Sequence, residues 1–293
     1  MVVSEARGKH AQSPLTLLRN AATFGFPPER VVFHYFGYGS NLHLPALRAK
    51  GVEPLSSVRG RLPGWRLTFN VRHWFPHEGG MGNICRTGNP DDEVQGVVHL
   101  CVDAALESLD RMEAYGVGYD RREVEVQTDA GLVRAQVYEG LPTFLDDRCV
   151  PTRRYLAILI KGAMAAGLDD SYIRRLREHP VAAEVEPPAF EPPAGDFPVF
   201  TRESLAQNPE LTALSGAVFD MSDSRPDLAS AKAVLGGRDT TLFHAHRHDS
   251  SDGIETLDDV RQCRVPDAVR RYLATWLHAY ATEFRYAGRY IDD

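Results

Sequence analysis

The sequence predicts an α+β protein, with a small, largely antiparallel, barrel-like sheet and flanking helices, followed by a smaller α+β domain. The chain has 293 residues, a length that favours two domains. Strand-like and helix-like runs alternate over residues 31–180, whereas 181–198 is rich in proline, which favours an extended connector. We therefore expect an N-terminal extension at 1–30, a first domain at 31–180, a linker at 181–198 and a second domain at 199–293.

Each element of the first domain is predicted from a local pattern. The apolar run at 31–36 predicts a buried strand, and a helix is expected to begin at Leu42. Asp129–Leu132 joins two strand-like runs and is typical of a hairpin. Within the extension, Ser13–Leu18 has the N-cap and proline pattern of a short helix. The other expected elements are strands at 64–71, 93–102, 123–128 and 133–139 and helices at 104–113, 153–166 and 170–178.

Composition and charge argue against several classes of protein. A formal net charge of −7 disfavours a nucleic-acid-binding surface, which would require a basic stripe. No apolar stretch approaches the roughly 20 residues that span a bilayer, and the first residues lack the apolar core of a signal peptide. The four cysteines lie far apart, in no metal-binding pair and no recognisable nucleophile context. This favours reduced thiols in a cytoplasmic protein, and we expect no metal, membrane or nucleic-acid partner.

The most informative feature is the tetrapeptide Tyr38–Asn41, between the first strand and the first helix. A strand that turns into a helix at Gly39, Ser40 and Asn41 leaves backbone N–H groups unpaired and pointing in one direction. Such groups suit a carboxylate or a developing oxyanion. The alternative interpretation is a helix N-cap by Ser40 or Asn41 that binds no ligand.

A second segment, Leu109–Tyr119, places Glu113 at the end of a predicted helix and ahead of two glycines. Taken alone, a glutamate in this position is by default a solvated surface residue. The Tyr38–Asn41 elbow followed later by a glutamate and Tyr-Gly-x-Gly-Tyr resembles the gamma-glutamylcyclotransferase family.

The resemblance covers about residues 31–180. The family pattern Tyr-Gly-Ser-Asn-Leu is matched at 38–42, its Gly-Val-Val strand at 96–98 and its Leu-Asp-x-x-Glu helix end at 109–113. The later stretch Tyr155–Leu176 is similar to the longer, glutathione-pathway enzymes of the family. The resemblance implies a gamma-glutamylcyclotransferase-like small β-barrel with flanking helices.

Two departures from the family pattern concern the turn after the glutamate. Ala114 stands where the family usually has glycine. The spacing from the glutamate to the tyrosine of the pattern is also one residue shorter than in the longer enzymes. The segment Arg72–Arg86, with two histidines, a tryptophan and three glycines, is expected to form a pocket wall that differs between members.

The resemblance implies a specific reaction on a small γ-glutamyl substrate. The α-amino group attacks its own γ-carbonyl, 5-oxoproline forms, and an amine or amino acid leaves. Because the attack is intramolecular, the enzyme mainly has to hold a folded conformer. Glu113 would accept a proton from the α-amino group and deliver one to the departing nitrogen. The backbone N–H groups of Gly39, Ser40, Asn41 and Leu42 would hold the substrate oxygens.

Four tyrosines complete the candidate binding site implied by the resemblance. Tyr119, Tyr138 and Tyr155 lie in the matched segments and are candidate pocket hydroxyls, although each could instead be a core or rim tyrosine. Tyr38 belongs to the matched loop and is expected to pack beneath it rather than to touch the substrate.

The order of motifs at 199–293 is similar to cytochrome-b5-like domains, especially the membrane-associated progesterone receptor branch. The shared motifs are Phe-Thr-x-Glu-x-Leu at 200–205, Val-Phe-Asp-x-Ser at 218–222 and Gly-Arg-Asp-Thr-Thr at 237–241. Some members of that fold bind haem through a histidine or a tyrosine. Here Arg225 stands at the histidine position and cannot ligate iron. Residues 223–235, ahead of the Gly-Arg-Asp turn, contain no tyrosine, so this second expected source of a ligand is also missing. We therefore expect a haem-free module used for packing or for contact with an unidentified protein partner.

Two alternatives remain open at this stage. His244 and His248 would share one face of a helix and could contribute to a metal or haem site, or the stretch could be a polar surface segment. The whole chain could correspondingly be a haem- or ligand-binding regulatory protein whose cyclotransferase-like domain only senses a γ-glutamyl metabolite. An enzyme with a fused non-catalytic module is the leading hypothesis, because the elbow and the Glu113 turn are both intact.

Overall fold

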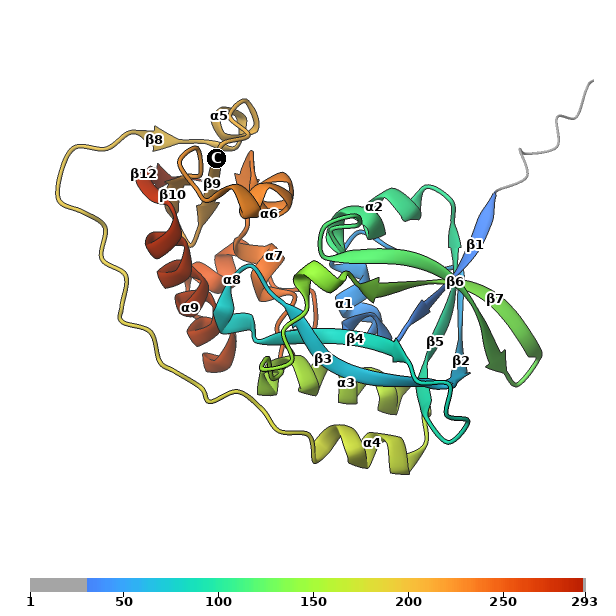
Figure 1. Ribbon diagram of the computed structural model, residues 1–293. Coiled ribbons are helices and arrows are strands. Elements are labelled where there is room, and N and C mark those ends of the chain that lie inside the picture. Colours follow the sequence, from blue (N-terminus) through green and yellow to red (C-terminus); the bar gives the residue numbers. More distant parts are fainter. Residues whose placement is uncertain (1–30, 292–293) are drawn as a thin grey trace, which may run out of the picture. The chain divides into compact units, whose positions relative to one another are not determined.

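A computed structural model describes residues 31–291, and Val32–Asp293 groups as one compact unit (Figure 1). The expected extension at 1–30, with its helix at Ser13–Leu18, lies outside the described residues. No helix within residues 31–291 is both long and apolar enough to cross a membrane.

Five strands close into a barrel in the order β1-β5-β2-β6-β7 (Figure 1). Neighbouring strands are antiparallel except β1 and β7, which pair in parallel with Tyr35 opposite Gln136. This confirms the predicted barrel with largely antiparallel pairing. The barrel strands are β1 (Val32–Gly37), β2 (Ser56–Pro63), β5 (Glu93–Val102), β6 (Tyr119–Thr128) and β7 (Gly131–Gly140).

Two strands of this region were not predicted from the sequence, namely β2 and β4 (Gly80–Arg86). Strand β4 contains Gly80 and Gly82 and pairs with β3 (Trp65–Arg72) in a separate hairpin. The first four residues of β2 are all exposed, so the strand shows no apolar–polar alternation there. Its Gly60 is required by the fold, because a Cβ atom at this position would lie 2.6 Å from Val126 Cγ1.

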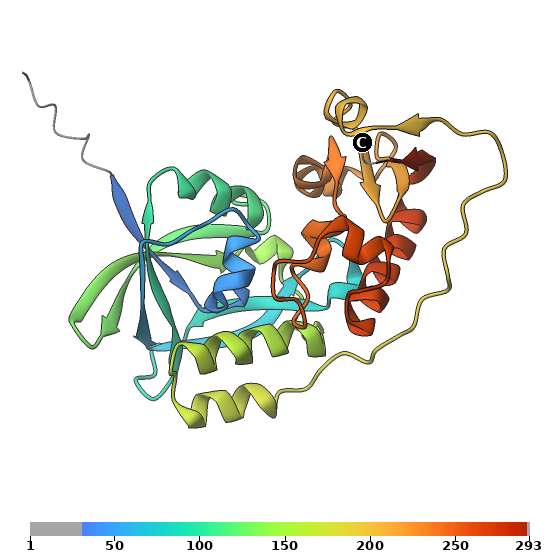
Figure 2. The ribbon, with the colours of Figure 1, turned by 180° about the vertical axis from the view of Figure 1, so that it is seen from behind.

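The helices of the barrel region begin and end close to their predicted limits, with one exception. The predicted helix from Leu42 is divided into a 3-10 turn at Ser40–Leu42 and helix α1 from Leu44, because His43 between them is extended. Figure 2 shows α3 and α4 side by side along one flank of the barrel, where their apolar faces share a core cluster with Phe69 and Val97. The helices are α1 (Leu44–Arg48), α2 (Ala105–Met112), α3 (Arg153–Ala165) and α4 (Asp170–Arg177), with further 3-10 turns at Pro76–Glu78 and Pro142–Phe144.

Beyond α4, residues 178–198 contain no helix or strand, and a second sheet follows in the order β11-β9-β10-β12-β8. The strands are β8 (Val199–Phe200), β9 (Leu211–Leu214), β10 (Ala217–Asp220), β11 (Arg238–Asp239) and β12 (Arg285–Tyr290). The helices are α5 (Arg202–Ala206), α6 (Ala229–Leu235), α7 (Thr241–Ala245), α8 (Leu257–Arg261) and α9 (Asp267–Glu283), with a 3-10 turn at Pro226–Leu228.

An aromatic side chain from the barrel region completes the core of the C-terminal region. Phe75, between β3 and β4, is buried in the cluster formed by the C-terminal helices and sheet. Its ring centroid lies 4.9 Å from that of Trp276 and 6.1 Å from that of Phe284. The stripe on α9 that includes Trp276 is therefore core, as its four-residue spacing indicates.

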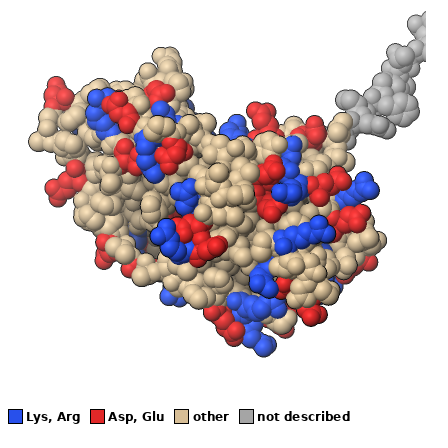
Figure 3. All heavy atoms as spheres, in the orientation of Figure 1, with Lys and Arg blue, Asp and Glu red and all other residues tan. Residues whose placement is uncertain are grey.

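Charged side chains of both signs are interspersed on the face drawn in Figure 3. The described residues include exposed ion pairs, such as Arg59 with Asp129 at 3.0 Å. Exposed pairs of this kind contribute little to stability because water and salt screen them.

The turn that follows α2 contains a strained residue. Ala114 has a φ angle of +48°, in the left-handed region that favours glycine, and its side chain is buried. This explains in physical terms why glycine is the usual residue after the glutamate in the family that the sequence resembles.

We predict that Ala114→Gly raises the free energy of unfolding by about 1 kcal/mol, because glycine adopts the left-handed conformation without a Cβ clash. Urea denaturation of the two proteins measures this difference. Ala157→Gly, in the interior of α3, is the matched control and should lower the free energy of unfolding, because glycine is a poor helix former. A destabilised Ala114→Gly protein would contradict the argument.

Candidate active site

The Tyr38–Asn41 loop leaves the end of β1 and is held from below by buried side chains. The Tyr38 hydroxyl donates to the carbonyl of Tyr138 at 2.6 Å. The His99 ring contacts the Asn41 carbonyl through Nε2 at 2.9 Å, and its Nδ1 contacts Ser57 Oγ at 2.8 Å. These contacts fix the loop backbone relative to the barrel wall.

The four predicted N–H groups of the loop differ in their surroundings. The Leu42 N–H donates to the carbonyl of Gly39 at 3.0 Å, closing the 3-10 turn. Within residues 31–291, no backbone carbonyl accepts from the N–H groups of Gly39, Ser40 or Asn41, but the Ser40 N–H faces the Tyr155 hydroxyl. The geometry therefore leaves Gly39 and Asn41 as donors, directs Ser40 to Tyr155 and uses Leu42 to shape the turn.

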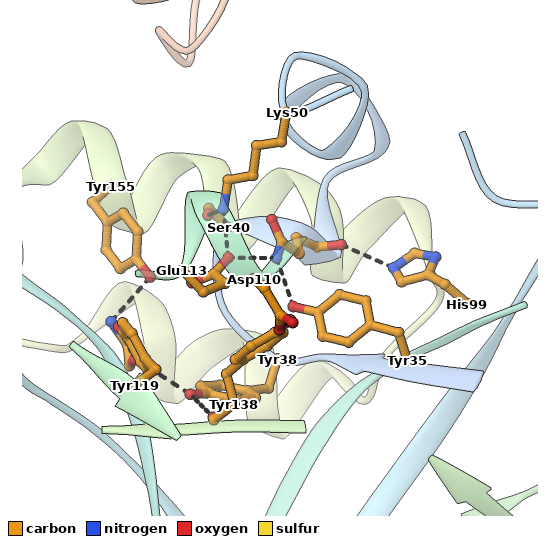
Figure 4. Close-up of polar contacts among 12 residues, drawn as sticks. Tyr35, Tyr38, Ser40, Lys50, His99, Asp110, Glu113, Tyr119, Tyr138 and Tyr155 are labelled. Atoms are coloured by element: carbon orange, nitrogen blue, oxygen red, sulfur yellow. Dashed lines mark hydrogen bonds and ion pairs between the residues drawn. The ribbon is translucent and has the colours of Figure 1, made fainter. Parts of the chain in front are cut away.

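Glu113 follows the last turn of α2 and points at this loop (Figure 4). Its Oε1 accepts from Lys50 Nζ at 2.8 Å and from Asn41 Nδ2 at 3.0 Å. The side chains of Lys50 and Glu113 are only 8% and 14% exposed, so their ion pair is largely shielded from water. No hydrogen bond or ion pair within the described part of the chain involves Oε2, which leaves that oxygen free for a substrate proton.

The four predicted tyrosines fall into two groups (Figure 4). Tyr119 and Tyr155 line the same cavity as Glu113 and Ser40. The Tyr119 hydroxyl donates to the Gly82 carbonyl at 2.8 Å, and the Tyr155 hydroxyl accepts from the Gly82 N–H at 3.0 Å. Burial raises the pKa of Tyr155 to about 12 and that of Tyr119 well above its ordinary range, so both hydroxyls are neutral.

Tyr38 and Tyr138 do not line this cavity and instead support it. The Tyr38 hydroxyl is used beneath the loop, as expected, and the Tyr138 hydroxyl donates to Asp110 Oδ1 at 2.6 Å. Asp110 also binds Arg121 at 2.7 Å, so Tyr138 belongs to a structural network on α2 and β6.

Several residues of the cavity were not identified from the sequence. Lys50 and Arg154 line it, and so does Arg247 from the C-terminal region. No spacing or motif marks these residues, because each reaches the cavity from a different element. The segment expected to form a pocket wall, Arg72–Arg86, does so through Arg72, His73, Trp74, Glu78 and Met81.

A buried carboxylate joins the cavity wall to the C-terminal region. Glu78 is 1% exposed and pairs with the guanidinium of Arg154 in α3. Tyr272 in α9 donates to Glu78 Oε1 at 2.7 Å, and Arg154 lies over the ring of Tyr272. Burial, the largest single effect, would raise the pKa of Glu78, but Arg154 together with His73, His77 and Arg247 outweighs it and holds that pKa well below its ordinary range.

The histidines of the C-terminal region are engaged in packing. His244 is buried, stacks on Trp276 with ring centroids 4.0 Å apart, and contacts the Tyr280 hydroxyl through Nε2 at 2.9 Å. His248 Nδ1 accepts from the Ser250 N–H at 3.0 Å. Among residues 31–291, no three His, Cys, Asp or Glu side chains are grouped as a metal site would require.

Comparisons with known proteins agree with the sequence resemblance. Residues 35–156 match the family described as gamma-glutamyl cyclotransferase, AIG2-like. The chain is 25% identical over 191 residues to gamma-glutamyl cyclotransferase aclK of Aspergillus oryzae, a match that covers 58% of this chain and 67% of the relative. It is 27% identical over 143 residues to gamma-glutamyl cyclotransferase gliK of Claviceps purpurea, covering 46% of this chain and 64% of the relative.

A solved structure described as a gamma-glutamyl cyclotransferase is 28% identical, covering 52% of this chain and 90% of that one with a TM-score of 0.47. The family match and the two curated relatives therefore show that the barrel region is similar to gamma-glutamyl cyclotransferases.

We predict that the Lys50–Glu113 ion pair contributes about 1–3 kcal/mol of coupling energy, because both charges are shielded from water. A double-mutant cycle with Lys50→Met and Glu113→Gln, followed by urea denaturation, measures it. The Arg48–Glu53 pair, with side chains 53% and 66% exposed, is the control and should show a much smaller coupling. Equal couplings for the two pairs would mean that burial does not strengthen the site pair.

Stability should fall as the pH is lowered from about 6.5 towards 4. Burial lowers the pKa of His73, His99 and His248 to about 4, whereas histidines in the unfolded chain titrate near 6.5. In this window the unfolded state binds more protons, so each histidine removes up to about 1.4 kcal/mol of stability per pH unit of acidification. Urea denaturation at three pH values gives the slope of the free energy of unfolding against pH. His99→Gln should reduce this slope by the contribution of one histidine. A free energy of unfolding that is constant across the window would contradict this assignment.

Proposed function

We propose that this protein is a cyclotransferase that cleaves the amide of a small γ-glutamyl substrate and releases 5-oxoproline with a free amine or amino acid. The observation that carries the proposal is the position of Glu113. One of its carboxylate oxygens is held by Lys50 and Asn41, and the other is free at a cavity shared with Ser40, Tyr119 and Tyr155. The two curated relatives that the chain resembles carry the name gamma-glutamyl cyclotransferase.

The reaction requires one new bond, one broken bond and one proton relay. The unprotonated α-amine attacks the γ-carbonyl carbon, and the new C–N bond closes a five-membered ring. Glu113 Oε2 accepts the proton that the attacking nitrogen loses and passes it to the departing nitrogen as the amide C–N bond breaks. Because both reacting groups belong to one molecule, holding the folded conformer supplies much of the acceleration.

Lys50 holds Glu113 in place for this relay. Its ammonium group donates to Oε1 at 2.8 Å and leaves Oε2 without a hydrogen-bond partner within residues 31–291, so that Oε2 can meet the substrate. The Asn41 amide also donates to Oε1 and fixes the orientation of the carboxylate.

The loop and the tyrosines would hold the oxygens of the substrate. The N–H groups of Gly39 and Asn41, which donate to no backbone carbonyl within residues 31–291, are suited to a carboxylate or to the oxyanion formed at the γ-carbon. A side chain at Gly39 would place its Cβ 3.0 Å from the Tyr155 hydroxyl, so glycine leaves room between the loop and this residue. The neutral Tyr119 and Tyr155 hydroxyls can donate or accept hydrogen bonds there.

For the C-terminal region we propose a cytochrome-b5-like module that carries no haem. The residues at the expected ligand positions do not fit haem, because Arg225 binds Glu283 at 3.1 Å and residues 223–235 contain no tyrosine. His244 is committed to Trp276 and Tyr280. We assign this module a packing role, and we place the protein in the cytoplasm because its cysteines are unpaired.

We predict that Glu113→Gln lowers the rate of 5-oxoproline release by about 10²–10⁴-fold, because glutamine cannot relay a proton. Mass spectrometry of 5-oxoproline released from a panel of γ-glutamyl amino acids and γ-glutamyl amines measures the rates. Glu107→Gln, an exposed glutamate on the same helix, is the matched control and should retain activity.

Two results would count against the enzyme. Undiminished turnover by Glu113→Gln would remove Glu113 from the mechanism. Binding of γ-glutamyl compounds without 5-oxoproline release by the unmodified protein would favour the regulatory, ligand-sensing alternative, and an absorbance spectrum of the purified protein would then test for haem.

A further inference from the structure

The cavity that contains Glu113 is lined in part by the C-terminal region. Ser40, Lys50 and Glu113 line one part of it, and Arg247 lines another. Arg247 lies between α7 and α8, more than 130 residues after Glu113, so the second region contributes directly to the cavity wall.

The residues that line the cavity carry an excess of positive charge. The cations are Lys50, Arg72, Arg154 and Arg247, and the anions are Glu78 and Glu113. Four cations and two anions leave a net charge of +2, although the whole chain has a formal net charge of −7. A cavity of this sign in an acidic protein selects for an anionic group on its ligand.

The two carboxylates neutralise two particular cations. Lys50 pairs with Glu113, and Arg154 pairs with Glu78. Arg72 donates to the carbonyl of Thr143 at 3.0 Å and is largely exposed to solvent. Arg247 is partly buried and forms no ion pair with a carboxylate within residues 31–291, although its charge contributes to lowering the pKa of Glu78. Its guanidinium carbon lies 4.8 Å from the Phe243 ring centroid.

The backbone of Arg247 is tied to the catalytic side of the cavity. Its carbonyl accepts from Arg154 Nη1 at 2.9 Å, and Arg154 precedes Tyr155 on α3. Its N–H donates to the carbonyl of His244, which is itself packed on Trp276. These hydrogen bonds fix the backbone from which the Arg247 side chain extends.

We propose that Arg247 binds a carboxylate on the leaving group of the γ-glutamyl substrate and so determines specificity. This inference rests on the proposed cyclotransferase function. The loop N–H groups and Glu113 serve the γ-glutamyl part, which is common to all such substrates. Arg247 then selects γ-glutamyl amino acids and peptides over γ-glutamyl amines that lack a carboxylate.

The test compares two substrates that differ only by the carboxylate of the leaving group, γ-glutamyl-alanine and γ-glutamyl-ethylamide. The unmodified protein should have a kcat/KM at least about tenfold higher for γ-glutamyl-alanine, as a charge-assisted hydrogen bond provides. R247Q should lower this ratio about tenfold, mainly through the KM of γ-glutamyl-alanine. R247K should retain part of the preference because it keeps the charge.

Two further variants separate a specific role from a structural one. R271Q removes the same charge from the exposed side of α9 and should leave the ratio as it is. R72Q removes the other unpaired cation of the cavity, and a ratio that collapses in R72Q but not in R247Q would overturn the assignment to Arg247. If R247Q lowers kcat/KM equally for both substrates and also lowers the midpoint of thermal unfolding, Arg247 has a structural role. That result would also overturn the assignment.

Calorimetry separates a failure of this inference from a failure of the proposed function. In the Glu113→Gln background, adding R247Q should weaken binding of γ-glutamyl-alanine about tenfold and should affect γ-glutamyl-ethylamide much less. If neither substrate yields 5-oxoproline but this difference in binding is seen, the reaction is wrong and the anion site stands. If both substrates are turned over and the ratio does not depend on Arg247, the reaction stands and the anion site is wrong.

Discussion

The buried ion pair between Glu78 and Arg154 is the interaction on which the arrangement of the cavity depends. Transferring a carboxylate from water to a site that is 1% exposed is costly unless it is paired and hydrogen-bonded. Arg154 supplies the charge and Tyr272 supplies a hydrogen bond, so the cost is offset only when the β3–β4 connection, α3 and α9 come together. Loss of Arg154 or Glu78 would leave a buried charge uncompensated, and loss of Tyr272 would remove a hydrogen bond to Glu78. The pair therefore specifies how the C-terminal region meets the barrel region.

The Glu78–Arg154 pair connects the packing of the C-terminal core with the residues that line the cavity of Glu113. Phe75, three residues before Glu78, occupies the C-terminal aromatic core, and Arg154 adjoins Tyr155 on α3. One short segment and one helix turn thus link the core of the second region to a tyrosine beside the candidate base. The same contacts hold the backbone of Arg247 at the cavity. The C-terminal region in this way contributes Arg247 and its charge to the cavity wall.

Around Glu113 the structure distinguishes residues that face the cavity from residues that support it, a difference that the sequence does not reveal. The loop of residues 39–42 was expected to act as a row of equivalent N–H donors, but Leu42 closes the turn, Ser40 faces the Tyr155 hydroxyl, and Gly39 and Asn41 donate to no backbone carbonyl within residues 31–291. The tyrosines divide similarly, with Tyr119 and Tyr155 at the cavity and Tyr38 and Tyr138 beneath it. Hydroxyl groups of identical chemistry acquire different roles because the barrel strands carry them to different depths.

The sequence by itself determined the elements with strong periodicity or turn signals, namely β1, β5, the β6–β7 hairpin and α2 to α4, together with the Glu113 turn and the loop it faces. Those features are encoded by neighbouring residues. Strands β2 and β4 were missed because glycines and exposed positions remove their local signal, and only barrel closure and hairpin pairing stabilise them. Lys50, Arg154 and Arg247 could not be predicted, since no local pattern encodes which distant charges meet. Tertiary structure decided that, because the desolvation of charged groups is offset only by partners brought together from separate elements.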